Sequence, residues 1–148
     1  MKDDNDDAGE HIGFVFECQG YKLSYMTDLG SITDTVMNLI MASDAYVIEA
    51  NYDKDLQMNS SRPWGLIKRI MGDFGHLSNE QATDYLIKVV DIDKTKKIFL
   101  AHLSRDCNNH ELAFSTVHNG LKKHYQVDYL PIKIVSEVGK RYHIFKAQ

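Results

Sequence analysis

The sequence lacks any apolar run of about 18 residues, the minimum that a membrane-spanning helix requires. Its first residues are acidic and polar, unlike the basic and then apolar start of a secretory signal peptide. Cys18 and Cys107 are too few for a disulfide framework, and we interpret them as free thiols of a reducing compartment. These absences predict a cytoplasmic protein that does not enter a membrane.

The chain also lacks an excess of basic charge. It holds 21 acidic and 17 basic residues, and residues 1–10 account for five of the acids and one of the bases. The rest is therefore balanced, and no general field attracts nucleic acid, although a local basic patch remains compatible with this composition. Residues 1–10 show no periodicity and are expected to be disordered. The remaining residues, 11–148, are expected to form one domain.

The N-terminal part of the domain alternates strands with a helix. Residues 12–17 and 21–26 are predicted strands joined by a tight turn at Gln19-Gly20. A helix capped at Thr33 runs to about residue 42, and a buried strand follows at 45–50. A mixed α/β (α+β) architecture is therefore expected.

A segment of different character follows. Residues 51–62 are predicted to form a long polar loop, and 63–74 a short helix with Trp64 facing inward. Arg62, Lys68 and Arg69 form a basic cluster in this region, for which a solvated face is the default interpretation and phosphate binding the alternative.

The segment from Gly75 to Arg105 carries the strongest functional signal. Ser78 is a good N-cap for a helix over about 79–90, and the apolar run 97–101 (KIFLA) predicts a strand buried on both faces. His76 precedes that helix and His102 follows that strand. Because α/β proteins place ligand sites past the carboxyl ends of strands, the two histidines are expected to share one site.

The C-terminal region is predicted to contain a helix over about 110–125. Strand-like runs at 127–130, 132–135 and 142–145 are expected to form an edge hairpin that completes the sheet.

Four motifs in order resemble one family. They are YMTDLG (25–30), DAYVIEANYD (44–53), GHLSNEQA (75–82) and FLAHLS (99–104). Together they are similar to the C-terminal half of metallo-β-lactamase-fold hydrolases. The likeness is to the phosphodiesterase branch, with its tRNA 3′-end-processing endonucleases and bacterial exonuclease-like proteins. The resemblance implies half of a four-layer αββα sandwich, with a mixed sheet and helices on one face.

The resemblance also implies roles for individual residues. Asp28 and His102 would be ligands of two divalent ions, with zinc expected and manganese as the alternative. Glu49 would orient His76 as a proton donor to the leaving group. Arg62, Lys68, Arg69 and Ser78 would contact the substrate. The residues alone favour turn capping for Asp28, and for Glu49 they leave an ion pair with a lysine or arginine equally open.

The HxHxDH motif of that family is absent from this sequence, and the stretch NDDA (5–8) has no histidine where the family has one. We therefore expect a half-domain that needs a second copy of itself or a separate N-terminal half to complete its metal site. Its substrate would be a nucleic acid or a nucleotide, and its reaction phosphodiester hydrolysis. The alternative is a non-catalytic interaction or fragment module that keeps the fold without the metals.

Overall fold

The computed structural model describes residues 13–136, which form one five-stranded mixed sheet and five helices. The strands are β1 (Gly13–Cys18), β2 (Tyr21–Met26), β3 (Ala45–Glu49), β4 (Lys97–Ala101) and β5 (Lys133–Ser136). The helices are α1 (Asp34–Ile40), α2 (Lys54–Met58), α3 (Trp64–Met71), α4 (Asn79–Val89) and α5 (His110–Tyr125). Residues 1–10, for which disorder was predicted, and the predicted strand 142–145 lie outside this range.

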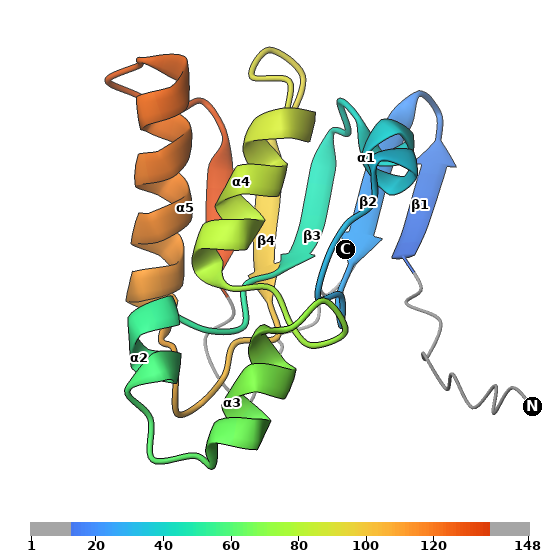
Figure 1. Ribbon diagram of the computed structural model, residues 1–148. Helices are drawn as coiled ribbons and strands as arrows, with labels where there is room; N and C mark the ends of the chain where they lie inside the picture. The colour runs from blue at the N-terminus through green and yellow to red at the C-terminus, as the bar shows by residue number, and fades with distance from the viewer. Residues whose placement is uncertain (1–12, 137–148) are drawn as a thin grey trace, which may run out of the picture.

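The strands follow one another across the sheet in chain order. β1 and β2 form the expected antiparallel hairpin, and Gln19 and Gly20 both have positive φ (50° and 82°), as a two-residue turn between twisted strands requires. The pairs β2–β3, β3–β4 and β4–β5 are all parallel. The carboxyl ends of β2, β3 and β4 therefore meet at one edge of the sheet, where Figure 1 shows α3.

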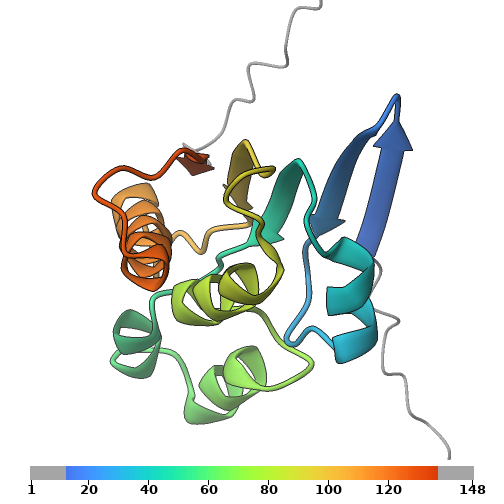
Figure 2. The same ribbon diagram turned by 90° about the horizontal axis from the view of Figure 1, so that it is seen from above.

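Helices cover only one face of the sheet within the described residues, as Figure 2 shows from above. α1, α4 and α5 pack there over a continuous apolar core. The core residues from β3 and β4 are Tyr46, Ile48, Ile98 and Leu100, and those from α4 and α5 are Ala82, Leu86, Val89, Ala113, Val117 and Leu121. This arrangement confirms the mixed sheet with helices on one face.

The opposite face of the sheet is apolar as well. A row of register partners crosses it through Phe14, Tyr25, Val47, Phe99 and Val135. Phe14 is 51% exposed and Tyr25 is 37% exposed, and the other three are half-buried. Strand β4 therefore alternates between buried and half-buried residues instead of being buried on both sides as predicted, because no described element covers this face.

The segment between β3 and α4 differs from its prediction. The expected loop 51–62 contains α2, which is capped by Asp53: the Asp53 side chain accepts the N–H of Leu56 at 2.9 Å. α3 is shorter than predicted, and Trp64 does not face inward: it is 58% exposed. Trp64 stands at the first position of the helix, so the turn that carries it projects into solvent, and Ile67 supplies the buried contact instead.

The C-terminal prediction is also corrected in part. β5 pairs with β4 in parallel, so it is an edge strand that continues the parallel sheet, and 127–130 contains no strand. Leu130 and Ile132 nevertheless belong to the core, because the connection from α5 passes over its margin. Cys18 is exposed and Cys107 buried, and both are free thiols, as expected.

Candidate metal centre at the carboxyl edge of the sheet

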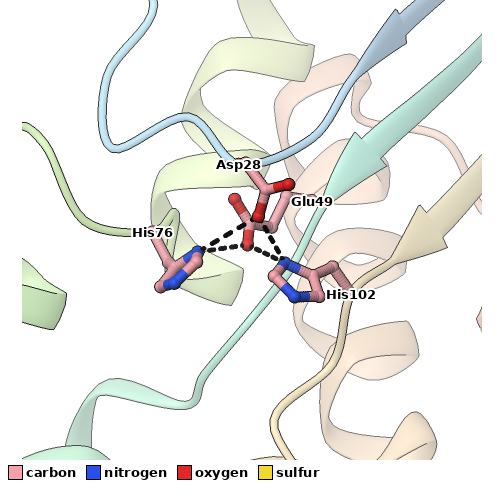
Figure 3. Close-up of side chains that lie close together, drawn as sticks. All are labelled: Asp28, Glu49, His76 and His102. Atoms are coloured by element: carbon pink, nitrogen blue, oxygen red, sulfur yellow. Dashed lines mark hydrogen bonds and ion pairs between the residues drawn. The ribbon is translucent and has the colours of Figure 1, made fainter. Parts of the chain in front are cut away.

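Four ionisable side chains converge where the parallel strands end (Figure 3). Asp28 follows β2, Glu49 is the last residue of β3, and His102 comes directly after β4. His76 approaches from the segment that joins α3 to α4. Each of the four offers a ligand atom, and these atoms all lie within 4.8 Å of one another. The expectation that His76 and His102 share one site agrees with this placement.

Glu49 is the centre of the cluster. Its side chain is fully buried, and its Oε1 lies 2.7 Å from Nδ1 of His76 and 2.6 Å from Nδ1 of His102. Its other oxygen accepts the backbone N–H of Leu29 at 3.2 Å. A buried carboxylate is costly unless such donors surround it, so these contacts account for an acid at the end of an apolar strand. The partners of Glu49 are histidines and a backbone amide, and not the lysine or arginine that the residues alone left open.

Asp28 completes the group from the solvent side. Its Oδ1 lies 3.2 Å from Nδ1 of His102 and 3.9 Å from Nδ1 of His76. Asp28 and His102 both have φ of 57°, in the left-handed region that most side chains avoid. Two residues of one cluster thus hold an uncommon backbone conformation, as is frequent where a chain must turn a side chain toward a site.

The backbone of Asn51 holds both histidine segments. Its N–H donates to the carbonyl of Leu77 at 2.9 Å, and its carbonyl accepts the N–H of Ser104 at 2.6 Å. Its side-chain amide donates to the carbonyl oxygen of His102 at 2.7 Å. Asn51 was not among the predicted site residues. Its position two residues after Glu49 was the available signal, since residues just past a strand end connect neighbouring loops.

A pair of buried amides supports the same edge. Asn79 and Asn108 exchange side-chain hydrogen bonds of 2.9 Å in both directions, and Asn108 also donates to the carbonyl of Ala50 at 2.9 Å. The pair joins the start of α4 to the end of β3. Asn79 lies in the motif GHLSNEQA (75–82), whereas Asn108 lies outside all four motifs, and the sequence gave no sign of their contact.

The segment that carries His76 is tightly packed. The N–H of His76 donates to the carbonyl of Ile70 in the last turn of α3 at 2.9 Å. A methyl group on Gly30 would overlap the carbonyl of Asp73 and lie 2.6 Å from the backbone nitrogen of Gly75. The loop after β2 and the loop before α4 can therefore touch only because residue 30 has no side chain.

The pKa of His76 is raised above its usual value. The main cause is the hydrogen bond with Glu49, which burial partly opposes, and the charges of Glu49 and Asp28 raise the pKa further. The imidazolium form of His76 is thus favoured, and this form can give up a proton.

The predicted substrate-contact residues differ in exposure: two are exposed, one is in an ion pair and one is buried. Lys68 and Arg69 are exposed on the last turn of α3. The guanidinium of Arg62 is within 3.2 Å of the Asp106 carboxylate. Ser78 is 3% exposed, and its hydroxyl accepts the N–H of Gln81 in a capping box at the start of α4. The capping that the sequence predicted for Ser78 is confirmed, and its hydroxyl is turned into the helix start and away from solvent.

Two imidazoles and two carboxylates are ligands that suit zinc and manganese. Nδ1 of His76 and Nδ1 of His102 both face the carboxylate oxygens of Glu49 and Asp28, so nitrogen and oxygen donors converge on one place. The donor set therefore fits a divalent ion.

Comparison with known proteins agrees with this fold and donor set. A family model described as a beta-lactamase superfamily domain matches residues 2–102. The exodeoxyribonuclease YycJ of Bacillus anthracis is 37% identical over 117 residues, which cover 79% of this chain and 44% of that protein. The exodeoxyribonuclease WalJ of Streptococcus pneumoniae is 41% identical over 96 residues, which cover 65% of this chain and 35% of that protein.

A solved structure shares the fold. Zinc-bound PqqB from Methylobacterium extorquens is similar with a TM-score of 0.52 at 15% sequence identity, over 86% of this chain and 42% of that one. The chain is thus of the metallo-β-lactamase fold, and its family implies divalent metal ions. The chain belongs to the beta-lactamase superfamily. It spans less than half the length of the two curated relatives. No helix among residues 13–136 is long and apolar enough to cross a membrane.

Proposed function

We propose that this chain contributes to a metal-dependent hydrolase of phosphodiester bonds, acting as a nuclease or a nucleotide phosphodiesterase. The observation that supports the proposal most strongly is the convergence of Asp28, Glu49, His76 and His102 within 4.8 Å. The two curated relatives are named exodeoxyribonucleases, which favours a nucleic-acid substrate.

In this proposal Asp28 and His102 hold the metal, with zinc expected and manganese as the alternative. Bound divalent ions in such a site supply a hydroxide nucleophile at neutral pH and polarise a phosphoryl oxygen. Glu49 fixes the ring of His102 through Nδ1, which keeps the imidazole oriented for the ion.

His76 is the proposed proton donor to the leaving oxygen. Its Nδ1 is 2.7 Å from Glu49, and its raised pKa keeps the ring protonated to higher pH than an isolated histidine. A residue that gives its proton to a leaving alkoxide typically contributes about 10²- to 10⁴-fold to the rate. Lys68 and Arg69 are proposed to attract the phosphate backbone.

The apolar open face of the sheet supports a partner. We propose that a second copy of this chain or a separate N-terminal half covers the row from Phe14 to Val135 and supplies the remaining metal ligands. Exposed aromatic residues on one face of a sheet are typical of surfaces that another protein layer buries. Sedimentation of the purified chain tests this: a stable monomer at micromolar concentration would argue against a self-completed site.

Elemental analysis of the purified chain tests the proposed function directly. We expect tightly bound zinc or manganese that His102→Ala removes and His76→Ala retains. His76→Ala should in addition lose turnover of a chromogenic phosphodiester by 100-fold or more. His124→Ala is the matched control, because His124 is exposed on the last turn of α5. Absence of metal even after supplementation would instead favour the non-catalytic module. Full turnover by His76→Ala would exclude His76 as the proton donor.

A further inference from the structure

The outward surface of α3 displays the only tryptophan of the chain. Trp64 is 58% exposed, an uncommon state for the largest apolar side chain in a soluble domain. Lys68 is one helical turn further along and also exposed, and residues four apart are neighbours on a helix surface. We call Trp64, Lys68 and Arg69 the α3 platform. It combines a flat aromatic ring, Lys68 on the same side of the helix and Arg69 about 100° further around it.

The stretch of sequence that contains the platform carries charge of one sign. Residues 59–72 contain Arg62, Lys68 and Arg69 and no acidic residue, in a chain with net charge −4. Arg62 is paired with Asp106. Within residues 13–136 no ion pair is found for Lys68 or Arg69, so their charges are available to an anionic ligand.

The helix that carries the platform is hydrogen-bonded to the metal centre through its last turn. The last turn of α3 accepts the N–H of His76 at 2.9 Å, through the carbonyl of Ile70 next to Arg69. Phe74, which is 73% exposed, lies in the short segment between them. Figure 1 shows α3 at the edge of the sheet where the strands carrying Asp28, Glu49 and His102 end. A chain-like ligand bound on α3 would thus have the site within reach.

We infer that the α3 platform binds single-stranded nucleic acid and guides it to the site, an inference that rests on the proposed phosphodiester chemistry and names its substrate class. An exposed tryptophan face accepts an unpaired base by stacking, and neighbouring cations neutralise the flanking phosphates. In a duplex the bases stack on one another and offer no face to the ring. A protein partner would not need two unpaired cations beside the aromatic ring.

The single tryptophan makes binding measurable at this one position. The full-length chain in EDTA is titrated with a short oligodeoxythymidine, an oligouridine and a duplex of matched length, and tryptophan emission is recorded. We expect quenching by the single strands and much less by the duplex. The comparison of DNA with RNA identifies which sugar is preferred. No change in emission with either single strand, or equal binding of the duplex, would overturn the inference.

Variants test whether the platform residues bind the strand. The affinity of each variant is measured by the fluorescence anisotropy of a labelled oligonucleotide. Trp64→Ala should weaken binding about 5- to 150-fold, as loss of one stacked base predicts, and Trp64→Phe should restore part of it. The double variant Lys68→Ala/Arg69→Ala should also reduce the dependence of log affinity on log salt by about 1.4, the amount expected for two lost phosphate contacts on a single strand.

The control variants change residues at the edge of the sheet opposite to α3. Tyr129→Ala removes an aromatic side chain that is 82% exposed, and Lys122→Ala/Lys123→Ala removes two charges from the last turn of α5. Both should bind as the unmodified chain does. If Trp64→Ala binds as tightly as Tyr129→Ala, the platform does not bind the strand. Because binding is measured in EDTA, it is separate from metal uptake and hydrolysis. A chain that binds the single strand but takes up no metal even after supplementation would count against the proposed function and leave the platform standing.

Discussion

The side-chain amide of Asn51 donates a 2.7 Å hydrogen bond to the carbonyl oxygen of His102, across 51 positions of sequence. The bond secures a histidine whose φ of 57° is unfavourable for a side chain of that size. Glu49, two residues earlier, holds the ring of the same histidine. One strand end thus fixes both the backbone and the side chain of His102.

Asn51→Ala should loosen His102 without removing any charge. The carbonyl of His102 would lose its donor, and we expect the free energy of unfolding to fall by about 1–2 kcal/mol. Metal affinity should fall with it, since His102 would no longer be held in place. Urea denaturation and metal titration measure the two effects. Asn59→Ala is the control, because the amide of Asn59 makes a similar 2.8 Å bond on the exposed side of α2. Equal effects of both substitutions would contradict the proposed positioning.

Glu49→Gln should lower the pKa of His76. The hydrogen bond with the Glu49 carboxylate is the largest cause of the raised value, and a neutral amide of the same shape favours the imidazolium far less. Histidine ring signals followed by NMR through a pH titration of the metal-free chain provide the measurement. Asp128→Asn, which removes a charge at the opposite edge, should leave the His76 titration unchanged. An unchanged pKa in Glu49→Gln would show that Glu49 does not control His76.

Alkaline pH should destabilise the fold through Tyr52. Burial raises the pKa of Tyr52 to about 12 from an ordinary value of 10.0, because a buried phenolate would lose its hydration. The unfolded chain releases this proton at lower pH than the native chain, so the stabilisation is complete below about pH 10 and is lost between about pH 10 and 12. The loss amounts to roughly 2–3 kcal/mol.

Tyr52→Phe should remove most of the fall in the free energy of unfolding between about pH 10 and 12. Denaturant unfolding at ~1-unit steps from pH 8 to pH 12 measures this free energy. Tyr129→Phe, at an exposed position, should retain the profile of the unmodified chain. A profile that stays equally steep in Tyr52→Phe would place the alkaline transition elsewhere.

Two glycine substitutions should have opposite effects. Gly30→Ala places a methyl group against Asp73 and Gly75, and a clash with backbone atoms should destabilise the fold by about 1–3 kcal/mol. Gly65→Ala points into open space on α3 and should stabilise the helix by up to about 1 kcal/mol. Thermal unfolding of the two variants under identical conditions measures the contrast. Equal stability would mean that the loops carrying Asp28 and His76 can separate at no cost.

The sequence was sufficient for most of the regular elements and for the residues that meet at the strand ends. Period-two and period-3.6 patterns located the strands and α1, α4 and α5, because those elements bury one face against a common core. Asp28, Glu49, His76 and His102 were identified through motifs, and the parallel order of β2, β3 and β4 explains why residues so far apart in sequence come together.

The features that were not predicted depend on contacts without a sequence pattern. α2 has five residues and a polar composition, and its start is fixed by one aspartate cap, so it reads as a loop. The exposure of Trp64 follows from where α3 sits against the domain, which hydrophobicity alone cannot determine. Asn51 and the Asn79–Asn108 pair make hydrogen bonds between segments far apart in sequence. The sequence around an asparagine does not reveal such a partner.

The sequential strand order has a consequence for synthesis on the ribosome. Each strand of the sheet pairs with the strand that emerged just before it, so the sheet can grow by addition at one edge as the chain lengthens. Asp28 and Glu49 emerge first, and His102 follows only after β4 is available to dock. The nascent domain therefore passes through a stage in which its carboxylates are in place and one imidazole is still to come. The four-residue cluster is therefore completed only after most of the described sheet has been synthesised.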